Sequence, residues 1–367
     1  MQFIDLQAQY QRIAIDVQAR MQKVFAHGQF ILGPEVTEVE EQMAKFVGVR
    51  HCITVSSGTD ALLVALMALD IQPGDEVITT PFTFVATASM VKLLGAKPIF
   101  VDIDPKTYNI DPAQVEAAIT DKTRVILPVN LYGQCADLER LEAIARKHNL
   151  YLIEDAAQSF GASLNNRRSC SFGHVGLTSF FPAKPLGCYG EGGACYTNND
   201  EIAHKIRLIR HHGQASRYHH VVLGLNARFD TLQAAVLLAK MAIFPDELAK
   251  RAVVAARYDE LLKPHVDIPY IAPGHTSVYA QYTIEVNDRE QVQSILNAAH
   301  IPTAVHYPVP LHLQPVFDDQ CYQIGVLKHA EVAADHVLSL PFHPYLTEED
   351  QQRVAQAVVA AITADVS

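Results

Sequence analysis

A single lysine, Lys184, interrupts residues 178–194, which read Thr-Ser-Phe-Phe-Pro-Ala-Lys-Pro-Leu-Gly-Cys-Tyr-Gly-Glu-Gly-Gly-Ala. Pro185 follows the lysine, and its ring pushes the preceding residue out of the α region, so Lys184 is expected on extended or turn backbone. Phe180 and Leu186 are apolar neighbours that do not fit a solvated face. A lysine held away from water favours its neutral amine, which is a nucleophile toward carbonyl groups. The segment is therefore either a surface loop with an ordinary lysine or a loop that binds a carbonyl-bearing cofactor.

Composition narrows the class of protein. The chain has 367 residues, a net charge of −11 and a pI near 5.8, which argues against a general nucleic-acid or membrane binder because such proteins carry a basic surface. No apolar run approaches the roughly 20 residues that span a bilayer, and the first residues do not read as a signal peptide. The cysteines show no metal-like spacing and read as reduced thiols of a cytoplasmic protein that binds no metal. They are Cys52, Cys135, Cys170, Cys188, Cys195 and Cys321.

Short apolar runs alternate with amphipathic segments through the first half of the chain. This alternation predicts an α/β fold with a mostly parallel central sheet covered on both faces. The expected strands are 52–55, 76–79, 98–101, 125–129 and 151–155. The expected helices are 6–27, 35–47 and 137–148, and the whole of 200–263 reads as helical.

The character of the sequence changes near residue 264, where prolines and a glycine cluster. We expect a large domain over 1–263 and a smaller α+β domain over 264–367. In the smaller domain the pattern predicts strands at 279–286 and 303–306, and helices at 289–299, 327–336 and 347–363.

Polar groups fall at the ends of several expected strands, where α/β sheets bind ligands. The turn Ser57-Gly58-Thr59-Asp60 opens a helix, and is either a phosphate cradle or an ordinary helix cap. Asp155 closes a buried strand and needs a partner, which could be a backbone N–H, an arginine or a protonated ring nitrogen. Phe84 offers a face for stacking on a ring, or packs in the core.

Taken together, a phosphate cradle, a stacking ring, a buried carboxylate and a lysine match pyridoxal 5′-phosphate. No G-x-G-x-x-G motif follows the first strand, so a nicotinamide dehydrogenase is poorly supported.

The order of these motifs resembles the DegT/DnrJ/EryC1/StrS sugar aminotransferases over nearly the whole chain. The resemblance implies the pyridoxal-phosphate transferase fold of type I and a homodimer with shared active sites. The matching segments are Gly33-Pro34-Glu35-Val36, Ser57 to Leu62, Pro73 to Ile78, Glu154 to Ser159, Ser179 with Lys184, and Asn226-Ala227-Arg228.

Roles for the cofactor site follow from the resemblance. Lys184 would bind the cofactor aldehyde covalently and carry protons, and Asp155 would pair with the ring nitrogen. The remaining cofactor contacts would be Gln158 at the ring hydroxyl, Phe84 stacked on the ring, Gly58, Thr59 and Ser179 at the phosphate, and Asn226 from the other subunit.

The same resemblance implies a sugar site. Its residues would be Gly28, Phe30, Ala183, Arg228, His306 and Tyr307. Phe30 and Ala183 depart from the pattern, which carries tyrosine and serine there, so two hydroxyl groups are missing on the sugar side.

Further segments, such as 132–137 and 302–308, resemble those members of the family that act in O-antigen assembly. They imply transfer of an amino group from L-glutamate to the 3-keto carbon of a UDP-linked 2-acetamido-2-deoxy-3-oxo-glucuronate. Three alternatives stay open: amination of another 3-keto or 4-keto sugar on UDP or dTDP, a dehydratase of the family, and a regulator that binds the cofactor without catalysis. Lys184 argues against the dehydratase, since such relatives carry histidine there.

Overall fold

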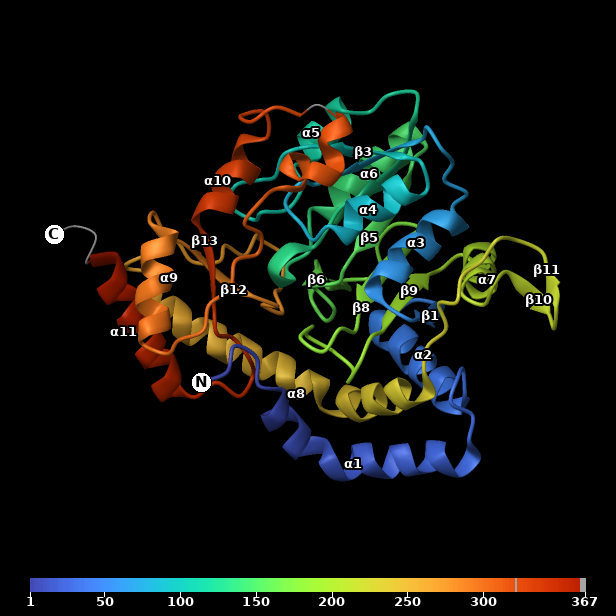
Figure 1. Ribbon diagram of the computed structural model, residues 1–367, viewed down its shortest axis with the longest axis horizontal. Coiled ribbons are helices and arrows are strands. Elements are labelled where there is room, and N and C mark those ends of the chain that lie inside the picture. Colours follow the sequence, from blue (N-terminus) through green and yellow to red (C-terminus); the bar gives the residue numbers. More distant parts are fainter. Residues whose placement is uncertain (321, 364–367) are drawn as a thin grey trace.

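The computed structural model describes residues 1–320 and 322–363, and its centre is a seven-stranded sheet (Figure 1). The strand order is β1-β9-β8-β5-β4-β2-β3. Only β9 runs in the direction opposite to the other six strands, so the prediction of a mostly parallel sheet is confirmed. The strands are β1 (His51–Val55), β2 (Glu76–Thr79), β3 (Lys97–Phe100), β4 (Thr123–Leu127), β5 (Tyr151–Asp155), β8 (Val175–Ser179) and β9 (Gly193–Thr197).

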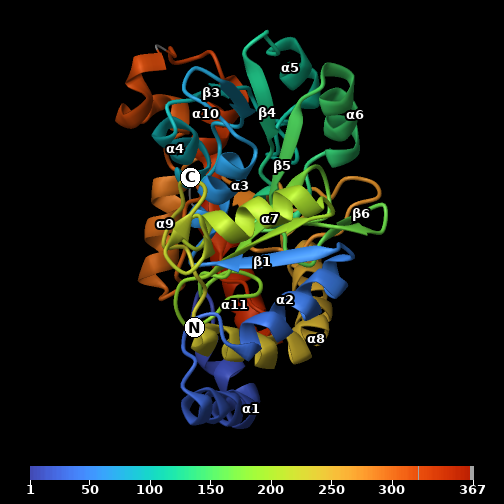
Figure 2. The same cartoon turned by 90° about the vertical axis from the view of Figure 1, so that its right-hand side faces the viewer.

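Helices cover both faces of this sheet, as Figure 2 shows around β1. Successive residues of β1 enter different cores: Ile53 packs with α3 and α7, whereas Cys52 packs with α2 and α8. This alternation follows from the two-residue period of a strand. The helices of this region are α1 (Leu6–His27), α2 (Pro34–Val47), α3 (Gly58–Ala68), α4 (Ala86–Leu93), α5 (Pro112–Ala117), α6 (Leu138–His148), α7 (Asp200–Ile209) and α8 (Thr231–Leu262).

The 32-residue helix α8 connects the two ends of the molecule (Figure 1). Its first half packs under the sheet and against α1, through contacts of Val236 and Ala239 with Ile13 and Val17. Its second half joins a separate core with the C-terminal elements. The domain boundary at 263/264 stays a prediction. The C-terminal elements of this core are β12 (Tyr282–Glu285), α9 (Arg289–Ala298), β13 (Val337–Leu340) and α11 (Glu348–Thr363). Helix α10 (Lys328–His336) packs instead in a cluster with Phe82 and Tyr132.

Two expectations about these elements were wrong. Residues 210–230 are not helical: α7 ends at Ile209, and a hairpin of β10 (Gln214–Ser216) and β11 (His219–His220) projects from the body (Figure 1). Residues 303–306 form no strand, and only Ala304 makes an isolated bridge, to Ser339. The short hairpin of β6 (Ser163–Leu164) and β7 (Arg167–Arg168) completes the strands of the described residues.

Five cysteines are free and buried, as expected of reduced thiols, and Cys321 lies outside the described residues. Within residues 1–320 and 322–363, no helix has both the length and the apolar character needed to cross a bilayer.

Candidate active site

The ends of β5 and β8 bring the predicted phosphate and ring residues together. These strands pair in parallel, so Asp155 and Ser179 finish at the same edge of the sheet. Gly58 begins α3 beside them: a Cβ added to Gly58 would lie 2.6 Å from the Cβ of Ser179. Ser57 caps this helix, its Oγ accepting a hydrogen bond from the Asp60 N–H at 3.0 Å. The helix N-terminus and the Ser179 hydroxyl therefore border one small space, which suits a phosphate group.

Asp155 is a buried carboxylate that is only partly satisfied by the protein. Its Oδ2 accepts a hydrogen bond from the Thr87 hydroxyl at 3.0 Å, and its Oδ1 accepts one from the Ala157 N–H at 3.1 Å. Burial raises the pKa of Asp155, while these two bonds and the Lys184 charge act in the opposite direction. A carboxylate has about four acceptor positions, so this one retains capacity for a protonated ring nitrogen.

Lys184 faces Asp155 from a tightly folded loop. The loop closes on itself through hydrogen bonds from the Lys184 N–H to the Phe181 carbonyl (2.9 Å) and from the Cys188 N–H to the Phe180 carbonyl (2.8 Å). Burial of the ammonium lowers the pKa of Lys184, and the nearby Asp155 charge opposes this change. The environment thus favours the neutral amine required of a nucleophile and proton carrier.

His306 and Tyr307 reach the same place from the C-terminal part of the chain. The Gln158 side chain lies between two tyrosines: its Oε1 accepts from the Tyr132 N–H at 2.9 Å, and its Nε2 lies 3.2 Å from the Tyr307 hydroxyl. Burial, together with the Lys184 charge, lowers the pKa of His306 to about 4, so the imidazole is neutral. The Phe84 ring is half exposed and lies 6.4 Å from the Tyr307 ring, so its face is free for stacking.

Thr87 and Tyr132 had no role assigned from sequence. Thr87 lies one helical turn after Phe84, and Tyr132 belongs to a turn, η1 (Leu131–Gly133), in which its φ is +58°. The Tyr132 hydroxyl donates to the His306 carbonyl, which ties the loop after β4 to the sugar-side loop. Only the tertiary fold brings these side chains to the site, so no local pattern signals them.

The remaining predicted residues are not brought against Lys184 by contacts within one chain. Asn226 is exposed. One Arg228 amine lies 3.3 Å from Nδ1 of His211, and the Arg228 Nε is buried without a hydrogen-bond partner among the described residues. Gly28 ends α1, and the exposed Phe30 accepts a backbone hydrogen bond from Thr231. Ala183 precedes Lys184 and is half-buried. Their roles stay predictions.

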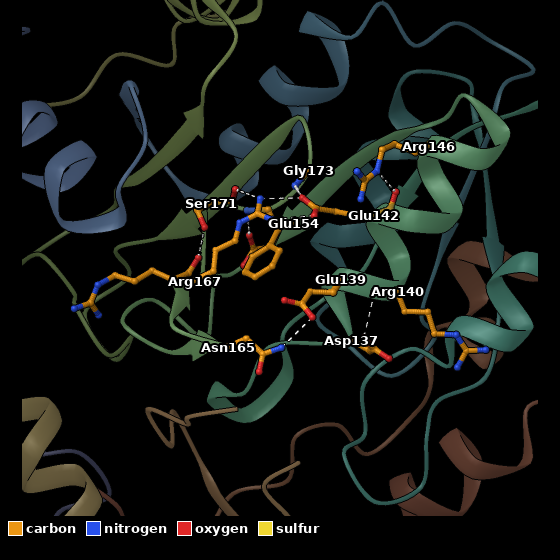
Figure 3. Close-up of polar contacts among 12 residues, drawn as sticks. Asp137, Glu139, Arg140, Glu142, Arg146, Glu154, Asn165, Arg167, Ser171 and Gly173 are labelled. Carbon is orange, nitrogen blue, oxygen red and sulfur yellow. Dashed lines mark hydrogen bonds and ion pairs between the residues drawn. The ribbon is translucent and has the colours of Figure 1, made fainter. Parts of the chain in front are cut away.

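A buried polar cluster supports Asp155 from behind. Glu154, the preceding residue on β5, is fully buried and faces away from the site. Its carboxylate accepts hydrogen bonds from the Asn130 and Ser169 side chains and from the Cys170 and Phe172 N–H groups, at 2.8 to 3.0 Å. Burial raises the pKa of Glu154 to about 7, although the hydrogen bonds to its carboxylate act to lower it. Figure 3 shows Glu154 and, nearby, the more exposed cluster of α6 and the β6–β7 hairpin.

The sequence matches the model of the DegT/DnrJ/EryC1/StrS aminotransferase family over residues 11–359. The UDP-2-acetamido-2-deoxy-3-oxo-D-glucuronate aminotransferase of Pseudomonas aeruginosa is 56% identical over 94% of this chain and 96% of its own. A pleiotropic regulatory protein of Geobacillus stearothermophilus is 46% identical over 97% and 96%. The crystal structure of a DegT DnrJ EryC1 StrS aminotransferase from Brucella abortus superposes with a TM-score of 0.95 at 45% identity, covering 99% of both chains.

Proposed function

The chain belongs to the DegT/DnrJ/EryC1/StrS aminotransferase family, and we propose that its substrates are L-glutamate and a UDP-linked 2-acetamido-2-deoxy-3-oxo-glucuronate. The family depends on pyridoxal 5′-phosphate. The observation that carries the proposal is the placement of Lys184 beside the buried, partly satisfied Asp155, in a chain 56% identical to an aminotransferase of that name. The product is the 3-amino sugar.

Each residue of the site has a distinct task in this proposal. Bound pyridoxal phosphate supplies an electron sink for the carbon that loses a proton. Asp155 holds the ring nitrogen in its charged form. Lys184 would bind the cofactor and move the proton to and from the reacting carbon; burial lowers its pKa, in the direction that favours the neutral amine this role needs. Gln158 and the Phe84 ring fix the ring plane, and Ser179 with the N-terminus of α3 holds the phosphate.

The acceptor sugar needs local cations because it carries a uronate and a diphosphate on a protein of net charge −11. Arg228 fits the uronate best, since a guanidinium binds a carboxylate through two parallel hydrogen bonds. One Arg228 amine lies 3.3 Å from Nδ1 of His211, and the Arg228 Nε is buried without a hydrogen-bond partner among the described residues, so no carboxylate of the same chain neutralises this cation through either atom.

Turnover of a matched pair of 3-keto sugar nucleotides, with and without the C6 carboxylate, tests the substrate. The proposal expects a strong preference for the uronate, and Arg228→Leu should remove that preference while leaving the half-reaction with glutamate intact. Equal turnover of both sugars by the unchanged enzyme would contradict the uronate assignment. Lys184→Ala is the control for the chemistry, because it should abolish turnover of either sugar.

A second candidate, a regulator that binds the cofactor, is favoured by the 46% identity to the Geobacillus regulatory protein. The two functions differ in their response to glutamate alone. An aminotransferase loses the visible absorbance of its lysine-bound cofactor when glutamate is added, and releases 2-oxoglutarate in equal amount. A regulator keeps its absorbance and yields no keto acid.

We infer also that the enzyme is a homodimer in which Asn226 and Arg228 serve the partner's site. The hairpin between α7 and α8 presents apolar side chains to solvent, with Tyr218 and Leu223 at 80% and 88% exposure. Val221 and Val222 extend this patch toward Asn226. Contiguous apolar surface of this kind is typical of a protein interface.

A further inference from the structure

The loop that follows Lys184 is attached to helix α8 by Tyr189. The Tyr189 N–H donates to the Gln233 Oε1 of α8 at 2.9 Å. At Gly190 the backbone comes so close to this side chain that an added Cβ would lie 2.9 Å from the Gln233 Nε2. Tyr189, five residues after Lys184, is thus attached to α8 at Gln233.

A second contact, from Lys240, holds the Tyr189 ring. The Lys240 Nζ lies 4.3 Å from the centre of that ring, within the distance of a cation–π interaction. Tyr10 of α1 packs edge-on against the same ring at 6.1 Å. The Tyr189 side chain therefore lies between α1 and α8, with the Lys240 cation on it.

Lys240 is an unusual residue to find in this interior. Its side chain is fully buried, and its Nζ has no hydrogen-bond partner among the described residues. The acid whose charge acts on it is Glu247, but the Glu247 carboxylate binds the Gln9 amide and the Tyr345 hydroxyl instead. The Cys188 thiol also faces it. Burial lowers the pKa of Lys240 to about 8, because the apolar surroundings disfavour the charged ammonium.

Such a cation does not serve the stability of the fold. Burying an ammonium without hydrogen bonds costs more than an apolar side chain of the same length would. Its favourable contact is with Tyr189, and Tyr189 is part of the loop that closes on Phe180 through Cys188.

We propose that Lys240 is a positioning residue, which fixes the Lys184 loop against α8 through the Tyr189 ring. The proposal rests on the assigned role of Lys184. A loop held at its far end keeps the Lys184 amine at a constant distance from Asp155. Since the second half of α8 packs in the C-terminal core that includes Val305, one helix holds both the lysine loop and the segment that carries His306.

Lys240→Met removes the charge and keeps the length of the side chain. We expect amide hydrogen exchange in peptides covering 184–190 to become at least about tenfold faster, in cofactor-free protein as well as in holoenzyme. The thermal midpoint should stay equal or rise. In the holoenzyme kcat should fall several-fold while KM for glutamate changes little. Lys250→Met is the matched control, because Lys250 lies on the same helix 6.0 Å from a tyrosine ring, Tyr345, but is exposed.

Tyr189 variants test the same contact from the other side. Tyr189→Phe keeps the ring and should leave exchange unchanged, whereas Tyr189→Leu should accelerate exchange as Lys240→Met does. The double variant should be no faster than either single one, because both remove one interaction.

Other outcomes would overturn the proposal. Unchanged exchange in the loop of Lys240→Met, or additive effects in the double variant, would show that Lys240 does not act through Tyr189. A lowered thermal midpoint with uniformly faster exchange would show a purely structural role. If the Lys184→Ala variant kept its activity, the proposed function on which this inference rests would be wrong. The hydrogen-exchange result does not depend on that activity and would still test the contact between Lys240 and Tyr189.

Discussion

Asp155 is the buried acid to which the proposal assigns the ring nitrogen of the cofactor. Its two protein hydrogen bonds, from Thr87 and Ala157, leave it free to hold a protonated ring nitrogen. Asp155→Asn keeps the shape but loses the charge, so kcat/KM for the glutamate half-reaction should fall on the order of 100-fold or more. Thr87→Val is the control: it removes one hydrogen bond worth about 1 kcal/mol, so kcat/KM should fall only about fivefold. Nearly unchanged activity of the Asp155→Asn enzyme would contradict the assignment.

Glu154 should give the protein a specific dependence of stability on pH. Burial raises its pKa from 4.5 to about 7, so ionisation is more costly in the folded than in the unfolded chain. Its contribution is complete below pH 4.5 and is lost as pH rises through 7. The shift corresponds to about 3 kcal/mol at most. The difference in unfolding free energy between wild type and Glu154→Gln, measured in urea, should decrease by that amount from about pH 4.5 to about pH 8.

Glu142 provides a control of opposite sign for that experiment. Burial raises its pKa, but the Arg167 guanidinium, with hydrogen bonds of 2.8 and 2.9 Å, and the Gly173 N–H outweigh burial and lower it overall (Figure 3). Its contribution is therefore present above its ordinary pKa and is lost as pH falls. If the difference in unfolding free energy between wild type and Glu154→Gln did not change with pH, Glu154 would keep one protonation state over this range and the prediction would be wrong.

The sequence pointed to candidate site residues where a polar or reactive side chain, or a glycine, lies next to a short apolar run. Lys184, Asp155 and the turn at Gly58 each follow or precede a short apolar run, and the strand order places them at one edge. Thr87 and Tyr132 could not be found this way, because their contacts with Asp155 and Gln158 join segments 68 and 26 residues apart. Contacts between residues so far apart in the sequence are determined by how the elements pack, and no local pattern predicts them.

The backbone at the start of α3 lies against Ser179, and this close approach requires a residue without a side chain at position 58. Gly58→Ala would place a methyl group 2.6 Å from the Ser179 Cβ, closer than atoms pack. We expect a loss of about 1–3 kcal/mol in stability and at least tenfold weaker cofactor binding, measured by titration of the cofactor-free protein. Gly74→Ala is the control: it lies in open space at φ +91°, so it should lower stability without affecting the cofactor. If the Gly58→Ala protein bound the cofactor with unchanged affinity, the phosphate would not bind at the start of α3.

Elements with a single clear period were predicted well, and those set by long-range pairing were not. The apolar runs of β1, β2 and β5 and the repeats of α1, α9 and α11 lie close to where the sequence places them. Strand β9 was missed because it follows a glycine-rich loop and pairs antiparallel with β1 and β8. The hairpin in 210–230 was read as helix, although Gly213 and Tyr218 adopt positive φ there and no helix can continue through them.

The proposed homodimer places the hairpin between α7 and α8 at the subunit interface. Arg228 and Asn226 follow the hairpin and are not brought against Lys184 within one chain, while Tyr218, at its turn, and Leu223, after β11, are exposed. If a second copy covers these apolar side chains, Leu223→Asp should convert the dimer into monomers in sedimentation experiments and remove activity. Arg228→Ala should instead leave the dimer intact.

Mixing two inactive variants tests the shared site directly. Lys184→Ala and Arg228→Ala each inactivate both sites of their own homodimer toward the uronate sugar. In a dimer with one subunit of each kind, and residues contributed across the interface, one site carries both changes and the other carries neither. After random exchange half of the dimers are mixed, so about a quarter of wild-type activity should return. If both residues served the site of their own chain, every site would stay defective and mixing would restore nothing. The same mixture prepared with Leu223→Asp in both chains should remain inactive, because no mixed dimer then forms.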